Sequence, residues 1–384
     1  MSVVRGDAVA LARALIAIDS RNPSLVAGGP GEGAVAKLLA EVLRDWGCAV
    51  ELQEVASGRP NVVARLGRRG GPSLMFNGHL DVVDVAGMVH PPFDPVERDG
   101  RIWGRGSADM KAGVASMCAA AVRALDQGLA GEVVIAAVVD EEFASAGTRA
   151  LIDRGIRADA AIVAEPTRLA IMPAHRGFVW LELDVVGRAA HGSRWDIGID
   201  AIRHAGLFLA ELDRYDATTL TARHHALLGR PSVHASMITG GTGMSTYPDR
   251  CVLSIERRTI PGETGAQVLS ELQELRDRVR LSQPDFDGTV TVSLSQSPSD
   301  VAPSAPIVRA LSDALVACGM PESIEGMSAW TDAALLNDAG IPAICFGPGD
   351  IVFAHAAEEF VPRQEIEDAT RVLTELALRW SASP

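Results

Sequence analysis

The chain has 384 residues, of which 47% are hydrophobic and 22% charged, and this length is enough for two or three globular domains of about 150 residues each. Its longest uninterrupted apolar run, residues 133–139, is far shorter than the roughly 20 residues that a membrane-spanning helix needs. Asp7, Arg13 and Asp19 interrupt the apolar N-terminal segment, so it lacks the core of a secretory signal. These features exclude a disordered or membrane-spanning chain and predict a cytoplasmic protein.

The charge balance and the cysteines narrow the function classes further. The 35 Lys and Arg residues against 49 Asp and Glu give a formal net charge of −14, which disfavours binding to nucleic acid or to an anionic membrane. The five cysteines are widely spaced and form no CxxC pair, which argues against a disulfide framework and against a thiolate zinc site. A metal site in this chain would therefore need histidine and carboxylate ligands.

The first part of the chain alternates helical and strand patterns. Helices are predicted at 7–19, 31–46, 112–127 and 148–154, and short strands at 50–55, 61–66, 73–77, 132–139 and 160–164. The strands 132–139 and 160–164 are apolar throughout, which indicates an α/β sheet covered on both faces.

The pattern changes near residue 178. Strands at 179–186, 233–238, 251–257 and 289–294, with helices at 199–212 and 266–279, give the βαββαβ order of a ferredoxin-like α+β module. Helices at 306–318 and 364–380 and a strand at 343–346 then resume the α/β pattern. We therefore expect an α/β domain formed by 1–177 and 297–384, interrupted by a second domain over 178–296.

Several polar side chains lie where predicted strands end. His79 and Asp81 follow one strand and project to the same side of an extended chain, so the carboxylate can orient the imidazole for metal binding, although a surface turn explains the pair equally well. Asp109 lies directly before a helix, where an N-cap carboxylate is the alternative to a metal ligand.

Further acidic groups follow the two apolar strands. Residues 140–142 carry three adjacent carboxylates, which repel one another and therefore need either a cation or solvent at the end of a buried strand. After the second strand, Pro166 holds Glu165 in an extended conformation. His355 follows a later strand and turn. Ligands bind at the carboxyl ends of strands in open α/β sheets, so these groups together match a hydrolytic zinc, manganese or cobalt site.

Six segments in the same order resemble motifs of the M20 metallopeptidase and aminoacylase family. They are GHLDVV (78–83), GRGSADMKAG (104–113), DEE (140–142), EPT (165–167), GRAAHGS (187–193) and AHAAEEFV (354–361). The resemblance is greatest to the branch that contains acetylornithine deacetylase and succinyl-diaminopimelate desuccinylase. It implies a mixed-sheet α/β zinc-hydrolase catalytic domain with an inserted α+β ferredoxin-like lid and dimerisation domain.

The resemblance also implies a metal centre. Asp109 would bridge two divalent ions, most often zinc in such sites, with cobalt and manganese as alternatives. His79 and Glu165 would complete one site, and Glu142 and His355 would complete the other. Two ions about 3.5–4 Å apart can share a nucleophile and an oxyanion.

The same resemblance assigns roles to residues around the metals. Glu141 would be the general base that takes a proton from the attacking water and returns it to the leaving amine. Asp81 would orient His79. A cis peptide bond is expected between Asp109 and Met110.

The inserted module would supply groups that contact the substrate. His191 resembles the histidine that the family presents across a dimer interface to the scissile carbonyl oxygen, and Arg258 resembles the arginine that binds the α-carboxylate. A solvated loop histidine and a surface ion pair are the alternatives for these two residues. Ser245 stands where the family usually has asparagine. Trp195 and Trp330 could line a pocket for an apolar group, or else pack in the core or on the surface.

The expected reaction is hydrolysis of the amide of an N-acyl amino acid by a homodimeric enzyme. A carboxypeptidase or dipeptidase acting on small peptides is the main alternative, and a carbamoylase-like enzyme is a more remote one. A non-catalytic binding protein is also remote, because Glu141 and all the metal ligands are present. Residues 31–36 fit the G-x-G-x-x-A fingerprint of a dinucleotide-binding oxidoreductase, but they follow Gly and Pro at 28–30 rather than a strand.

Overall fold

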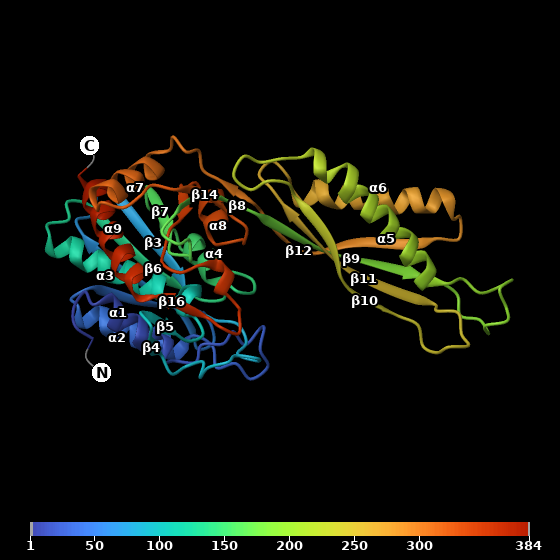
Figure 1. Ribbon diagram of the computed structural model, residues 1–384, viewed down its shortest axis with the longest axis horizontal. Helices are drawn as coiled ribbons and strands as arrows, with labels where there is room; N and C mark the ends of the chain where they lie inside the picture. The colour runs from blue at the N-terminus through green and yellow to red at the C-terminus, as the bar shows by residue number, and fades with distance from the viewer. Residues whose placement is uncertain (1–2, 383–384) are drawn as a thin grey trace. The chain divides into compact units, whose positions relative to one another are not determined.

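The computed structural model describes residues 3–382, and the chain divides into two compact units. Unit 1 contains the described residues up to Pro173, together with Val301–Glu325 and the described residues from Thr331 onward. Unit 2 contains Ala174–Asp300 and Gly326–Trp330 (Figure 1). Among residues 3–382, no helix combines the length and the apolarity needed to cross a membrane.

Unit 1 is built on a mixed sheet. Its strands in spatial order are β1 (Ala49–Ala56), β2 (Arg59–Gly67), β6 (Glu132–Val138), β3 (Ser73–His79), β7 (Ala160–Val163), β15 (Ala343–Cys345) and β8 (Ile171–His175). The four central strands β6, β3, β7 and β15 run parallel to one another, whereas β2 and β8 pair antiparallel with this core. Ala174 and His175 at the end of β8 belong to unit 2, where they pair with the short strand β13 (Ser299–Asp300). The short strand β14 (Ile324–Met327) also pairs with β8.

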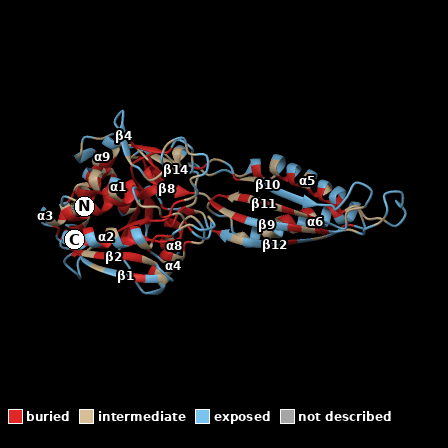
Figure 2. Cartoon of the chain, turned by 90° about the horizontal axis from the view of Figure 1, so that it is seen from below, coloured by how far each residue is buried: buried red, intermediate tan, exposed pale blue. Residues whose placement is uncertain are grey.

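Helices cover both faces of this sheet. One layer contains α1 (Ala8–Ile16), α2 (Gly33–Asp45), α3 (Ala112–Asp126), α7 (Pro306–Ala317) and α9 (Arg363–Ser381). The alternate strand residues Leu74 and Phe76 belong to the core under this layer, whereas Asn61 and Asn77 of β2 and β3 hydrogen-bond α4 (Ala146–Asp153) on the other face. Helix α8 (Ala333–Asp338) packs beside α4, so the central strands β6, β3, β7 and β15 lie buried between the two layers. The edge strand β1 is mostly exposed, and Figure 2 shows the contrast between the buried interior and this edge.

Unit 2 has the βαββαβ order that the sequence predicts. Its elements are β9 (Gly177–Val186), α5 (Ala201–Thr218), β10 (Ser232–Gly240), β11 (Arg250–Thr259), α6 (Gly265–Ser282) and β12 (Asp287–Gln296). The antiparallel sheet has the order β10-β11-β9-β12. Alternate residues of β9, such as Leu181 and Leu183, pack in a core with α5 and α6, while Trp180 and Glu182 lie on the other face. The predicted fold class, an α/β chain with an α+β module, is confirmed.

Some elements were not predicted. A small sheet of β16 (Phe360–Pro362), β5 (Arg101–Trp103) and β4 (Val96–Arg98) ties the segment after His355 to the segment before Asp109. Single turns of helix lie at Leu220–Ala222 and Ile351–Phe353, whereas Asp109 and Met110 interrupt the segment Ser107–Lys111 with non-helical backbone angles. The small sheet fixes two loops that carry residues of the candidate site.

Candidate active site

The site is formed at the carboxyl ends of the parallel strands of unit 1. His79 is the last residue of β3, and a single residue separates residues 140–142 from the end of β6 and Glu165 from the end of β7. Asp109 lies in the turn that leads into α3, and His355 follows the short helical turn after β15. Parallel strands place their carboxyl ends at one edge of the sheet, which brings these distant segments together.

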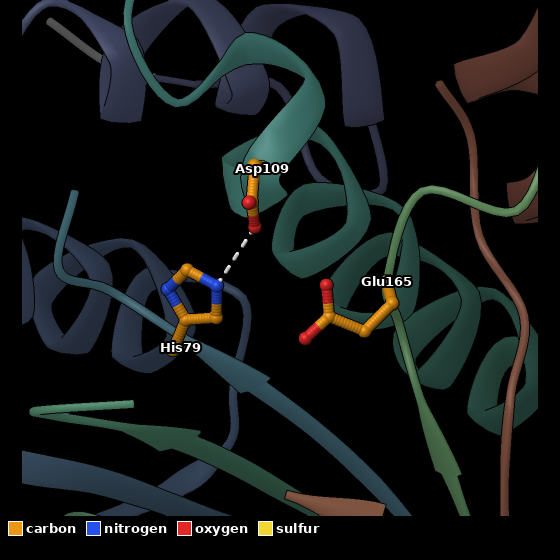
Figure 3. A group of neighbouring side chains, drawn as sticks. All are labelled: His79, Asp109 and Glu165. Carbon is orange, nitrogen blue, oxygen red and sulfur yellow. Dashed lines mark hydrogen bonds and ion pairs between the residues drawn. The ribbon is translucent and has the colours of Figure 1, made fainter. Parts of the chain in front are cut away.

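A first group of ligand atoms comes from His79, Asp109 and Glu165. The ligand atoms of the three side chains lie within 4.8 Å of one another, and all three residues are buried. The Nε2 atom of His79 lies 2.9 Å from Oδ1 of Asp109, and the carboxylate of Glu165 faces the same space (Figure 3).

A second group shares Asp109 with the first. Its ligand atoms, from Asp109, Glu142 and His355, again lie within 4.8 Å of one another. Nε2 of His355 lies 3.0 Å from Oε2 of Glu142 and 3.5 Å from Oδ2 of Asp109. Asp109 therefore directs one carboxylate oxygen to each histidine. The His355 side chain is 53% exposed, so this side of the site is open to solvent.

Glu141 and Asp332 lie outside both ligand groups and add to the acidity of the centre. Burial raises the pKa of Glu141 well above its ordinary value, and the charges of Glu165, Asp332 and Glu142 add to this effect although His79 opposes it. Burial and the charge of Asp109 likewise raise the pKa of Glu165. A buried cation would relieve both effects, because an opposite charge nearby favours the ionised carboxylate.

The same cluster of charges also shifts the pKa values of His79, His355 and Asp109. Burial opposes the charged form of His79, yet its hydrogen bond to Asp109 and the surrounding carboxylates raise its pKa well above 6.5. The hydrogen bonds to Asp109 and Glu142 raise the pKa of His355 to about 10. Although burial opposes it, the two imidazoles hold the pKa of Asp109 well below its ordinary value.

The residues present fit two divalent cations. Oε1 of Glu142 is buried and has no hydrogen-bond partner, which is costly for a carboxylate oxygen unless a ligand completes its environment. Nδ1 of His79 lies 2.9 Å from the backbone carbonyl oxygen of Asp81, so it carries the proton in the neutral ring and leaves the Nε2 lone pair directed into the site. Imidazole and carboxylate donors suit zinc, cobalt and manganese.

Asp81 holds the neighbouring acidic turn rather than the imidazole alone. Its Oδ1 lies 3.6 Å from Nδ1 of His79, beyond hydrogen-bond range, and the backbone carbonyl of Asp81 makes the direct contact instead. Its carboxylate accepts the backbone N–H groups of Glu141 and Glu142 at 3.2 and 3.1 Å. Burial raises the pKa of Asp81 to about 7.

Glu359 is a buried residue of the site for which the sequence suggested no role. Its Oε1 accepts the backbone N–H groups of Ala108 and Asp109 at 2.9 and 3.2 Å, and its Oε2 pairs with Arg105 at 2.6 Å. The Asp109–Met110 peptide bond is cis, as the resemblance predicted. The only sequence signal for Glu359 was its place in the AHAAEEFV segment with His355.

The remaining predicted residues belong to unit 2. The loops of His191 and Ser245 lie side by side, because Gly192 N–H donates to the Ser245 carbonyl oxygen at 2.7 Å. The His191 ring is exposed, and its Nδ1 lies 2.8 Å from Oγ of Ser193. The structure thus brings His191 and Ser245 together within unit 2 and the five candidate metal ligands together within unit 1.

Arg258 and the two tryptophans have separate environments in unit 2. Arg258 lies on β11, where it pairs with Glu256 at 3.0 Å and stacks over the ring of Phe178. Trp330 meets the same ring edge to face, whereas Trp195 is 80% exposed. Arg258 and Trp330 therefore share one aromatic contact, and Trp195 does not take part in the core of unit 2.

Comparison with known proteins places this geometry in a family. A profile of peptidase family M20/M25/M40 matches residues 75–379. Acetylornithine deacetylase from Myxococcus xanthus is 31% identical over 327 residues, which cover 84% of each chain. Aminopeptidase PepT from Bacillus cereus ATCC 10987 has a structure with a TM-score of 0.81 at 20% identity, and the match covers 100% of both chains. The YXEP protein of Bacillus subtilis, described as a dinuclear metal binding peptidase from the M20 family, matches with a TM-score of 0.76 at 17% identity over 98% of both chains.

These matches confirm the family suggested by the six sequence motifs. The profile covers most of the chain, including every motif of the two candidate metal groups. The two solved structures share its fold over nearly their whole length. The chain therefore belongs to peptidase family M20/M25/M40 and is a metallohydrolase that cleaves amide or peptide bonds.

Proposed function

We propose that this protein is an N-acyl amino acid amidohydrolase that uses two divalent metal ions. Zinc is the proposed metal at both sites, with cobalt and manganese as alternatives. The observation that carries the proposal is the pair of ligand groups that share Asp109, with Glu141 beside them. His79 and Glu165 hold one ion, and Glu142 and His355 hold the other. When bound, the ions supply Lewis acidity that lowers the pKa of water and polarises the scissile carbonyl.

The protein side of the reaction rests on Glu141. Its Oε2 lies 4.0 Å from Nε2 of His79, within the site but outside both ligand groups. Glu141 accepts the proton of the attacking water and delivers it to the leaving amine. Asp81 supports this step by holding the backbone of Glu141 and Glu142.

Residues of unit 2 complete the substrate site in this proposal. Arg258 binds the α-carboxylate of the substrate through its planar guanidinium, and Ser245 makes a further polar contact. His191 of the partner subunit donates a hydrogen bond to the scissile carbonyl oxygen in a homodimer. The 31% identity to acetylornithine deacetylase favours an N-acyl amino acid over a peptide as the substrate.

A substrate panel tests the proposal. Protein stripped of metal and reloaded with zinc, cobalt or manganese is assayed with N-acetyl, N-succinyl and N-carbamoyl amino acids and with dipeptides. We expect metal-dependent turnover of an N-acyl amino acid and a loss of about 10²–10⁴-fold in kcat for Glu141→Gln. Glu358→Gln changes an exposed glutamate of the His355 segment and serves as the matched control. Turnover of dipeptides alone would establish a peptidase instead.

Metal stoichiometry tests the shared ligand separately from turnover. Asp109→Ala removes a ligand from both groups, so the variant is expected to lose both ions on dialysis, whereas Glu165→Ala and His355→Ala each lose one. Elemental analysis by inductively coupled plasma mass spectrometry gives the ratio directly. Two ions retained in Asp109→Ala would contradict the shared role.

A further inference from the structure

The turn that carries Glu141 and Glu142 has an unusual backbone. It begins at Asp140 with φ of 68° and ends at Ser145 with φ of 54°, both in the left-handed region that non-glycine residues rarely adopt. Within the turn, the Ala144 and Ser145 N–H groups fold back to the carbonyl oxygen of Asp140. Such a conformation persists only where its surroundings fix it.

Asn22 joins the two carboxylates that anchor this turn. One anchor is Asp81, which accepts the N–H groups of the two glutamates, and the other is the side chain of Asp140. Nδ2 of Asn22 donates to Oδ2 of Asp81 at 2.8 Å and to Oδ1 of Asp140 at 3.1 Å. The amide therefore sets the spacing between the anchors. Asn22 is fully buried, so solvent does not compete for these bonds.

Arg59 of β2 donates hydrogen bonds to the side chains of both Asn22 and Asp140. Its Nη2 donates to Oδ1 of Asn22 at 3.3 Å and to Oδ1 of Asp140 at 3.0 Å. It also forms a two-pronged pair with the buried Glu32, through Nε at 2.6 Å and Nη2 at 2.7 Å. Because Oδ1 of Asn22 faces Arg59, its Nδ2 must face the carboxylates. Glu32 in turn accepts the backbone N–H of Asp140 at 3.0 Å.

We propose that Asn22 and Arg59 are positioning residues that fix the Glu141–Glu142 turn in its active geometry. Neither residue is among the metal ligands, and both act through Asp81 and Asp140. The catalytic meaning of this inference rests on the proposed function, in which Glu141 is the base and Glu142 a metal ligand. The structural part, that this network holds the turn, stands independently of the reaction.

Four variants test the inference. Asn22→Ala removes the amide that joins Asp81 and Asp140, and Arg59→Met removes the guanidinium with its charge. Arg59→Lys keeps the positive charge without the two parallel hydrogen bonds to Glu32. Arg65→Met is the matched control, because Arg65 lies on the same strand and pairs with Glu132 at the start of β6, whereas the turn follows the other end of β6. We expect Asn22→Ala and Arg59→Met to lose about 10–100-fold in zinc affinity and in kcat, with KM within about twofold of wild type. Arg59→Lys should recover part of the loss.

Hydrogen–deuterium exchange of the metal-free proteins supplies a readout that does not depend on the reaction. Exchange of the amides at 140–145 should become faster in Asn22→Ala and unchanged in Arg65→Met. Arg59→Met leaves the buried carboxylates of Glu32 and Asp140 without their cation and can prevent folding. If Arg59→Met does not fold, Asn22→Ala provides the test, because it removes only a neutral amide.

The positioning role and the proposed function fail through different outcomes. Unchanged exchange at 140–145, or faster exchange with unchanged zinc affinity, would overturn the positioning role. If the wild-type protein neither binds zinc nor hydrolyses any substrate, the proposed function fails. In that case the exchange experiment alone decides whether the network holds the turn.

Discussion

Single residues outside the candidate metal ligands also lie in environments that shift their pKa values. His175 of β8 is buried, and its Nδ1 donates to the carbonyl oxygen of Arg176 at 3.0 Å. Its Nε2 is buried without a hydrogen-bond partner. A protonated ring would leave a second N–H unsatisfied, so burial lowers the pKa of His175 to about 4.

His175 should make the stability of the protein fall in mild acid. Between pH 6.5 and about 4 the unfolded chain binds a proton that the folded chain does not, so this contribution is complete above pH 6.5 and is lost as the pH falls. The free energy of unfolding should decline by up to about 1.4 kcal/mol per pH unit in this interval through His175. Urea unfolding of the metal-free protein from pH 4.5 to 7.5 measures the slope.

The variants separate His175 from other titrating groups. His175→Gln should flatten the acid slope relative to wild type, whereas His234→Gln, which removes a side chain that is 56% exposed, should leave it unchanged. Equal slopes for wild type and His175→Gln would show that the folded protein accommodates the protonated ring.

Elements rather than residues set the distance between the candidate ligands. Helix α3 begins just after Asp109, and β7 ends just before Glu165. Gly113 in the first turn of α3 lies so close to β7 that an added Cβ would meet the Ala164 carbonyl oxygen at 1.9 Å. The helix can therefore approach the strand only because this residue lacks a side chain.

Two glycines in helices should respond to alanine in opposite ways. Gly113→Ala forces α3 away from β7, so it should destabilise the protein by about 1–3 kcal/mol or more and weaken zinc binding by the group containing Asp109 and Glu165. Gly206→Ala in α5 meets nothing within 4 Å and should stabilise by up to about 1 kcal/mol, because alanine is the better helix former. Thermal unfolding and zinc titration check both; a well-tolerated Gly113→Ala would contradict the close packing.

The sequence predicted elements that have a long apolar run or a clear period and missed those that have neither. The apolar strands β6 and β7 and the amphipathic helix α9 follow from their patterns alone. Strand β8 contains Pro173, and the strands of the small sheet have three residues each, too few for any period. Their existence depends on partners far along the chain, which local patterns do not contain.

The place of the candidate site could be predicted because His79, residues 140–142 and Glu165 lie at the ends of strands. The full ligand set, with Asp109 and His355, came from the resemblance to the family motifs, and the residues that hold the ligands could not be predicted. Nothing near Glu359 in sequence indicates that it would accept the N–H groups of Ala108 and Asp109. The same holds for Asn22 and Arg59, whose shared contact with Asp140 depends on segments distant in sequence. Buried polar networks are satisfied by tertiary contacts, so they become visible only when the chain is folded.

At the scale of the whole molecule, the sheet of unit 2 has an open edge. Among residues 3–382, strand β10 pairs only with β11, and its residues 234–240 are all exposed. Met237 and Ile238 are large apolar side chains on this edge, with 65% and 55% of their surface accessible. An unpaired edge with apolar side chains favours pairing with another strand, and a second copy of the chain supplies an identical one.

The proposed homodimer makes a prediction about active-site complementation. If the partner subunit's His191 completes each site, a heterodimer of His191→Ala and Glu141→Ala chains contains one fully competent site, formed on the chain that keeps Glu141. Random reassociation of equal amounts makes half of the dimers mixed, so the mixture should recover about a quarter of wild-type activity. The two inactive variants are mixed, dissociated in mild denaturant, refolded together and assayed, with differently tagged chains used to isolate the mixed dimers. If both residues act within one chain, the mixed dimers have no competent site, because each chain lacks one of the two groups, and their activity stays at the level of the single variants.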